Sequence, residues 1–122
     1  MKELRVVLVD DSELIQEYLK RALLTIKGCN VVGAAGEGDE GLLMIRTLLP
    51  DVVLLDVSMP VKGGLEVLRE LREENSEVIV IMFTADSTPL LKQACLATGA
   101  NYFVSKTEFR QVVDIFAELQ RA

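Results

Sequence analysis

Polar and ionisable side chains follow four of the five apolar runs in this sequence. In chain order these residues are Asp10, Asp11, Asp56, Thr84 and Lys106. Three carboxylates in one cleft repel one another, and a hard divalent cation relieves that repulsion. Carboxylate oxygens are the ligands that Mg²⁺ prefers, and the chain has no histidine, which disfavours a zinc site. If the five runs are strands that end at one edge of a sheet, the sequence indicates a Mg²⁺ or Mn²⁺ site there.

The same residues suit the transfer of a phosphoryl group. Such a transfer needs mainly positioning and neutralisation of charge. A carboxylate can act as the nucleophile and form an acyl phosphate. The ammonium group of Lys106 would supply the charge opposite to that of a transferred phosphoryl group, and the Thr84 hydroxyl could donate a hydrogen bond to it. The pattern therefore favours phosphoryl chemistry on an aspartate.

The elements that must position these residues are strands and helices in alternation. The predicted strands are Leu4–Val9 and residues 31–35, 52–55, 78–83 and 101–104. The predicted helices are residues 14–26, 38–49 and 65–71, one starting with a Thr88 cap before Pro89, and one marked by residues 112–119. Strands that are apolar on both faces require helices on both sides of a parallel sheet. Ligands of such sheets bind at the carboxyl ends of the strands.

Composition and charge limit the class of protein. A chain of 122 residues suits one domain, which we expect to cover residues 1–122. A net charge of −6 repels a phosphate backbone, so we expect no direct binding of nucleic acid by this domain. No apolar run reaches membrane-spanning length. Cys29 and Cys95 have no ligand-like spacing, and we expect free thiols in a reducing cytoplasm and no membrane association.

Over its whole length the chain resembles the receiver domains of two-component response regulators. The residues that carry the resemblance are the pair Asp10 and Asp11, Asp56 within LLDVSMP, Gly64, Thr84 followed by Ala85, and Lys106 after YFVS. The segments VVGAAGEGDEGL and ATGANYFVSK are similar to receivers of the NarL/FixJ type. Those receivers usually precede a helix-turn-helix DNA-binding domain. A free-standing receiver and a fragment of a longer regulator both fit the sequence.

The resemblance implies a flavodoxin-like α/β fold with strand order 2-1-3-4-5. It also implies that Asp56 accepts a phosphoryl group from the phosphohistidine of a sensor histidine kinase or phosphotransfer protein. The cofactor would be Mg²⁺ or Mn²⁺, bound by Asp11, Asp56 and the backbone carbonyl of Ser58, with Asp10 close by. On this interpretation the chain is a signalling module that catalyses its own phosphorylation and dephosphorylation.

A conformational switch is a further implication of the resemblance. Thr84 and Lys106 would contact the phosphoryl group, and Phe103 would be the aromatic residue that moves with Thr84. The surface formed by the fourth helix, the fifth strand and the fifth helix would then bind an output domain, a downstream protein or a second copy in a phosphorylation-dependent dimer. Many family members have proline after the lysine, often with a cis peptide bond, where this chain has Thr107. A cis bond before threonine costs more than one before proline, so we do not assume a cis bond there.

Two other functions remain as alternatives. An aspartate-nucleophile phosphohydrolase of the haloacid-dehalogenase type has a second aspartate two residues after the nucleophile, where this chain has Ser58. A degenerate receiver that acts only as a protein-binding scaffold would not need intact site residues. Residues 36–41 match the glycine pattern of dinucleotide-binding loops, but Glu37, Asp39 and Glu40 would repel a pyrophosphate, so we do not expect a nucleotide there.

Overall fold

The computed structural model describes residues 2–121, in which five strands and five helices alternate along the chain. The strands are β1 (Leu4–Val9), β2 (Cys29–Ala35), β3 (Val52–Leu55), β4 (Ile79–Thr84) and β5 (Tyr102–Ser105). The helices are α1 (Glu13–Leu23), α2 (Gly38–Leu48), α3 (Gly64–Glu73), α4 (Pro89–Thr98) and α5 (Phe109–Arg121). All neighbouring strands are parallel, in the predicted order β2-β1-β3-β4-β5.

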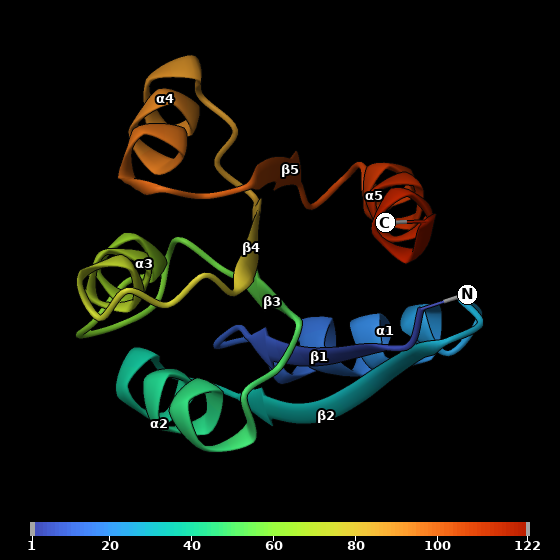
Figure 1. Ribbon diagram of the computed structural model, residues 1–122. Helices are drawn as coiled ribbons and strands as arrows, with labels where there is room; N and C mark the ends of the chain where they lie inside the picture. The colour runs from blue at the N-terminus through green and yellow to red at the C-terminus, as the bar shows by residue number, and fades with distance from the viewer. Residues whose placement is uncertain (1, 122) are drawn as a thin grey trace.

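The sheet forms the middle of three layers. Helices α2, α3 and α4 cover one face and helices α1 and α5 cover the other (Figure 1). Alternate residues of β1 show why both faces need a cover. Leu4, Val6 and Leu8 are buried in the apolar cluster that includes residues of α1 and α5, whereas Val7 and Val9 are buried with residues of α2 and α3. The continuous apolar runs of the sequence are therefore strands buried on two sides.

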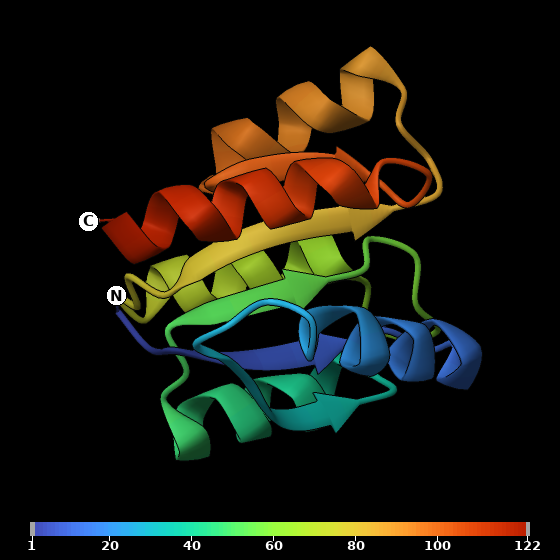
Figure 2. The same cartoon turned by 90° about the vertical axis from the view of Figure 1, so that its right-hand side faces the viewer.

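The carboxyl ends of the strands meet at one edge of the sheet, as the arrowheads in Figure 2 show. The register brings the site residues together there. Val9 pairs with Leu55, and the amide of Asp56 donates to the carbonyl of Val9 at 2.9 Å. On the other side of the sheet centre, Thr84 is the last residue of β4, and its carbonyl accepts from the amide of Lys106 at 2.8 Å.

The boundaries of three strands differ by one or two residues from the prediction. Strand β2 begins at Cys29 rather than at residue 31, because Cys29 and Asn30 pair with the start of β1. Strands β4 and β5 each begin and end one residue later than predicted, and their last residues, Thr84 and Ser105, pair with each other. Ladder pairing decides these boundaries, whereas the prediction followed apolar character alone.

The ends of two helices also differ from the prediction. The first helix ends at Leu23, and Ile26, predicted to lie within it, packs against the core from the following turn. The second helix ends at Leu48, because Leu49 adopts a left-handed conformation with φ of 49°. Thr88 precedes α4 as predicted, but its hydroxyl makes no capping hydrogen bond. Its amide instead donates to Asp86 Oδ1 at 3.1 Å.

Both cysteines are free, as predicted, and the structure buries both. Burial raises the pKa of the Cys29 thiol to about 11, so this thiol stays protonated at neutral pH. Within residues 2–121, no helix combines the length and the apolar character that crossing a membrane would require.

Candidate functional site

An acidic cluster lies at the carboxyl edge of the sheet. Asp10 and Asp11 follow β1 and Asp56 follows β3, and one carboxylate oxygen of each lies within 4.8 Å of those of the other two. The side chains of Asp10 and Asp56 are buried, whereas Asp11 is exposed. The structure thus brings together the three carboxylates that the sequence predicted to converge, with two at the base of the site and one at its mouth.

Lys106 lies between the two buried carboxylates. Its Nζ is 2.8 Å from Asp10 Oδ2 and 3.4 Å from Asp56 Oδ2. Burial alone would lower the pKa of Lys106, but the two carboxylates outweigh burial and raise its pKa above the ordinary value. The pKa of Asp56 is raised by burial and, secondarily, by the charge of Asp10, against the opposing effect of Lys106. Ionisation of Asp56 is thus costly, and Lys106 compensates for this cost only in part.

Main-chain amides fix the orientation of both buried carboxylates. The amide of Ser12 donates to Asp10 Oδ1 at 2.9 Å, and the amide of Ser58 donates to Asp56 Oδ1 at 3.3 Å. The Ser12 hydroxyl accepts from the amide of Ile15 at 3.2 Å and begins α1 directly after the acidic pair. Each carboxylate is therefore held by the residue two positions after it.

Gln16 supports the acidic loop in a way that sequence reasoning missed. Its Nε2 donates to the carbonyl of Asp10 at 2.7 Å and to that of Ala35 at 3.2 Å, which joins the ends of β1 and β2. A lone glutamine on a helix carries no signal for this role. Gly64, which was part of the recognised pattern, has a steric role: a Cβ there would lie 2.0 Å from the carbonyl oxygen of Asp56.

The donor set fits a hard divalent cation. The three aspartates offer only oxygen ligands, which suit Mg²⁺ and Mn²⁺. Three carboxylates against one ammonium also leave a net negative charge, which a divalent cation would neutralise. Ser58, the predicted carbonyl ligand, has its main chain beside Asp56 through the amide hydrogen bond.

The predicted switch residues occupy the neighbouring strands β4 and β5. Thr84 is buried, and its hydroxyl oxygen accepts from the amide of Asp86 at 3.3 Å. Phe103 is half-buried, pairs in register with Met82 of β4, and packs against the apolar cluster on the α2–α4 face. The structure therefore places Phe103 beside the strand that carries Thr84, as the predicted coupling requires.

In the glycine-rich segment, residues 36–41, a carboxylate of the segment itself binds a main-chain amide. Glu40 Oε1 accepts from the amide of Gly36 at 2.9 Å, so a carboxylate lies where a nucleotide phosphate would have to bind. This contact agrees with the expectation that residues 36–41 do not bind a dinucleotide.

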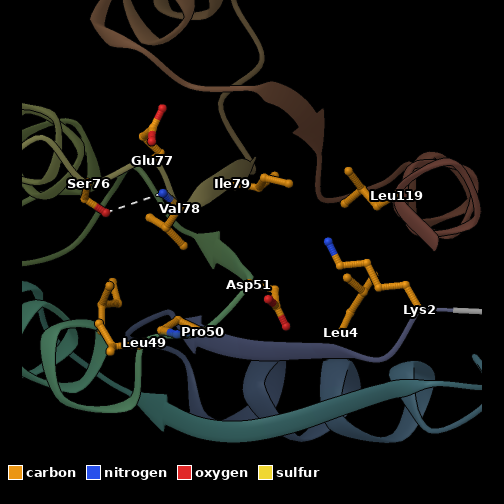
Figure 3. A pocket seen from close by; sticks show the side chains of 11 residues that line it. Lys2, Leu4, Leu49, Pro50, Asp51, Ser76, Glu77, Val78, Ile79 and Leu119 are labelled. Carbon is orange, nitrogen blue, oxygen red and sulfur yellow. Dashed lines mark hydrogen bonds between the residues drawn. The ribbon is translucent and has the colours of Figure 1, made fainter. Parts of the chain in front are cut away.

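A hollow of about 400 Å³ lies at the opposite, amino-terminal edge of the sheet (Figure 3). Its lining comes from the starts of β1 and β4, the connections that precede β3 and β4, Ile45 of α2, and the end of α5. The carboxylate of Asp51 in this hollow accepts from the amide of Arg5 at 2.8 Å. None of the predicted site residues lines this hollow.

A doubly wound parallel sheet with an acidic cluster and a lysine at its carboxyl edge defines the CheY-like class of receiver domains. Comparison with known families agrees, since the response regulator receiver domain model matches residues 6–117. The chain belongs to this family of two-component signalling proteins.

Relatives and solved structures support the assignment. The chain is 40% identical over 103 residues to the response regulator UvrY of Escherichia coli (strain K12), covering 84% of this chain and 47% of UvrY. It is 38% identical over 105 residues to the probable C4-dicarboxylate response regulator DctR of Bacillus subtilis (strain 168), covering 86% and 46% of the two chains. The receiver domain of the putative response regulator NarL from Mycobacterium tuberculosis superposes with a TM-score of 0.91 at 32% identity, over 100% of this chain and 99% of that one. The chain thus spans about half the length of the curated relatives it matches.

Proposed function

We propose that Asp56 is the phosphoacceptor of this receiver domain. The observation that carries the proposal is the ion-paired arrangement of Asp56, Asp10 and Lys106 at the carboxyl edge of the sheet. A carboxylate oxygen of Asp56 would attack the phosphorus of a phosphohistidine, the N–P bond would break, and the histidine would leave with the electron pair of that bond. The product on Asp56 would be an acyl phosphate. The chain contains no histidine, so the donor is a sensor histidine kinase or phosphotransfer protein, acting from another chain or region.

The charged groups of the site have separate roles in this proposal. Lys106 pairs with the transferred phosphoryl group, and the Thr84 hydroxyl donates a hydrogen bond to it. Asp10, Asp11, Asp56 and the backbone carbonyl of Ser58 hold Mg²⁺ or Mn²⁺. A bound divalent ion supplies charge neutralisation for the phosphoryl oxygens. The same groups would serve hydrolysis of the acyl phosphate, in which water attacks the phosphorus, the bond to the Asp56 oxygen breaks, and inorganic phosphate and the free carboxylate are released. Dephosphorylation would then be a property of the domain itself.

The phosphorylated state would be recognised on the surface of α4, β5 and α5. Leu90 and Leu96 of α4 are exposed apolar residues on that surface. An output domain, a downstream protein or a second copy of the chain would bind there after Thr84 and Phe103 rearrange. We place this recognition of the phosphorylated domain in the cytoplasm, where the domain contacts neither a membrane nor nucleic acid.

Incubation with acetyl phosphate and Mg²⁺, followed by intact-mass measurement, tests the acceptor. The wild-type protein should gain the mass of one phosphoryl group, and Asp56→Ala should gain none, because it lacks the nucleophile. The matched variant Asp51→Ala removes a carboxylate at the opposite edge and should still be phosphorylated. A full mass gain in Asp56→Ala would show that another residue accepts the phosphoryl group. A wild-type protein that gains no mass would favour the scaffold alternative.

A further inference from the structure

The connection between β3 and α3, residues 56–63, contains a strained turn. Val61 has a left-handed φ of 67°, although it is β-branched and its side chain is 99% exposed. The amide of Lys62 donates to the carbonyl of Pro60 at 2.8 Å and closes a tight γ-turn around Val61. Such a conformation is disfavoured for a β-branched residue and persists only where the surrounding structure holds it. This connection also carries Asp56 and Ser58.

The side chain of Lys62 is held on two helices. Its Nζ lies 2.9 Å from Asp39 Oδ1 in the first turn of α2 and 2.5 Å from Glu70 Oε2 in α3. The Lys62 side chain is only 21% exposed. Its main chain is close to α2 as well, since a Cβ on Gly38 would lie 2.7 Å from the carbonyl oxygen of Lys62. The lysine therefore ties the end of the strained turn to both neighbouring helices.

The rest of the connection transmits this restraint to the acidic cluster. The amide of Gly64 donates to the carbonyl of Val57 at 2.9 Å and closes the connection onto the end of β3. Within that closed segment, the amide of Ser58 donates to Asp56 Oδ1. Motion of the turn around Val61 would thus displace the main chain that lies against the candidate phosphoacceptor.

We propose that Lys62 is a positioning residue for the phosphorylation site. Its ion pairs with Asp39 and Glu70 hold the β3–α3 connection so that the main chain of Ser58 stays beside Asp56. The inference rests on the proposed function, because the process it affects is binding of a divalent ion by the acidic cluster. The partner carboxylates are open to solvent, with Asp39 71% and Glu70 36% exposed, and ion pairs with such partners contribute little to global stability. The effect is therefore local to the site rather than to the fold.

The sign of the effect separates positioning from simple electrostatics. Loss of the Lys62 charge makes the neighbourhood of the acidic cluster more negative, which by itself would strengthen binding of a cation. Loss of the restraint instead leaves a ligand-bearing segment less well placed, which weakens binding. The Lys62→Met variant keeps most of the side chain and removes only the ammonium group, so it sets these two effects against each other.

The experiment is a titration with MgCl₂ followed by amide shifts in NMR spectra. Lys62→Met should raise the dissociation constant for Mg²⁺ about fivefold, less than the loss typical of a side chain that bonds a metal ligand directly. Lys62→Arg should restore nearly wild-type affinity, and Asp39→Asn should weaken binding in the same direction but less. Lys27→Met, an exposed lysine in the turn before β2, should bind Mg²⁺ like the wild type. Asp11→Ala lacks one of the proposed Mg²⁺ ligands and shows how far the affinity falls when a ligand itself is removed.

Amide hydrogen exchange without metal gives a second readout. In Lys62→Met, the amides of Ser58 and Gly64 should exchange faster than in the wild type, whereas those of α5 should be unchanged. If Lys62→Met bound Mg²⁺ as tightly as the wild type or more tightly, the positioning role of Lys62 would be wrong, while the proposed function would be unaffected. A wild-type protein that binds no Mg²⁺ would overturn the metal assignment in the proposed function, and with it this role of Lys62.

Discussion

Charge balance at individual residues decides what the acidic cluster can bind. Asp10 and Asp56 are buried and share the single ammonium of Lys106, while Asp11 adds a third carboxylate at the mouth. With all four groups ionised, three negative charges face one positive charge. The remaining excess corresponds to the charge of one divalent cation. The cluster is thus arranged for a ligand at the expense of its own stability.

The raised pKa of Asp56 makes a prediction about stability and pH. The folded state binds the Asp56 proton more tightly than the unfolded state, because burial and then the charge of Asp10 oppose ionisation. The free energy of unfolding should therefore fall as pH rises from the ordinary value towards the raised value, and stay lowered at neutral pH. Asp56→Asn removes this penalty and should melt at a higher temperature than wild type at pH 7 in EDTA.

Thermal unfolding between pH 3 and 7, followed by circular dichroism, measures this difference. The advantage of Asp56→Asn should disappear below about pH 4, where the wild-type carboxyl is protonated in both states. Asp114→Asn, on the exposed side of α5, should show no comparable gain. If Asp56→Asn melted below the wild type at pH 7, the pair with Lys106 would outweigh the desolvation of Asp56.

Local backbone conformation governs how the elements end. Among residues 2–121, Leu49, Val61 and Asn75 are the non-glycine residues with positive φ. Asparagine tolerates the left-handed region, whereas leucine and valine do not. Leu49 ends α2 in this conformation at the position where helices most often have glycine or asparagine. Leu49 is 74% exposed, so packing of its side chain offsets little of the conformational strain.

Leu49→Asn should therefore stabilise the protein. Relief of the left-handed conformation should raise the free energy of unfolding by about 1 kcal/mol. The control Leu43→Asn replaces an exposed leucine within the same helix and should lower stability by a few tenths of a kcal/mol, roughly the difference in helix propensity. Urea denaturation compares the three proteins. A Leu49→Asn variant less stable than wild type would show that the exposed leucine contributes more through contacts than it costs in conformation.

The order of elements could be predicted from the sequence because its apolar runs are short, continuous and separated by helical periodicity. The convergence of Asp10, Asp56 and Lys106 followed, since parallel strands end at one edge. Element ends were less predictable. Cys29 and Thr84 belong to strands through ladder hydrogen bonds, which apolar character does not reveal.

Supporting residues of the site were beyond sequence reasoning for a different physical reason. Gln16 and Lys62 are long polar side chains of kinds that usually point to solvent. Their roles depend on contacts with Ala35, Asp39 and Glu70, which lie far along the chain or on another helix. Only the three-dimensional arrangement brings those partners within reach.

At the scale of the whole molecule, helix α4 is held more firmly at its carboxyl end than at its amino-terminal end. Cys95 is the one buried residue of this helix in the described structure, whereas α3 buries four residues. The carboxyl end of α4 is anchored, because Arg72 of α3 donates from Nη2 to Gly99 O at 2.9 Å and to Asn101 Oδ1 at 3.0 Å. Residues 85–90 before and at the start of α4 are exposed. A switch at Thr84 would therefore move the amino-terminal end of α4 about a fixed carboxyl end.

NMR spectra with Mg²⁺ and beryllofluoride, a mimic of the phosphoryl group, test this coupled switch. Large shift changes should include Thr84, Ala85, Phe103 and the first turn of α4, while Gly99 should change little because Arg72 holds it. Thr84→Ala should abolish the changes at Phe103, because the hydroxyl that would follow the phosphoryl group is absent. Changes confined to residues that touch Asp56 would instead mean that the domain signals by local charge alone.

The two outer strands of the sheet have a consequence for how copies of this protein can associate. Strand β2 carries a bulge, since its register against β1 skips Val32 between Val31 and Gly33. Strand β5, at the other edge, has only four residues. Bulged and short edge strands are poor templates for pairing with strands of another molecule. Crowded copies of this protein should therefore resist growth into continuous intermolecular sheets, and reversible assembly is left to the faces of the helices.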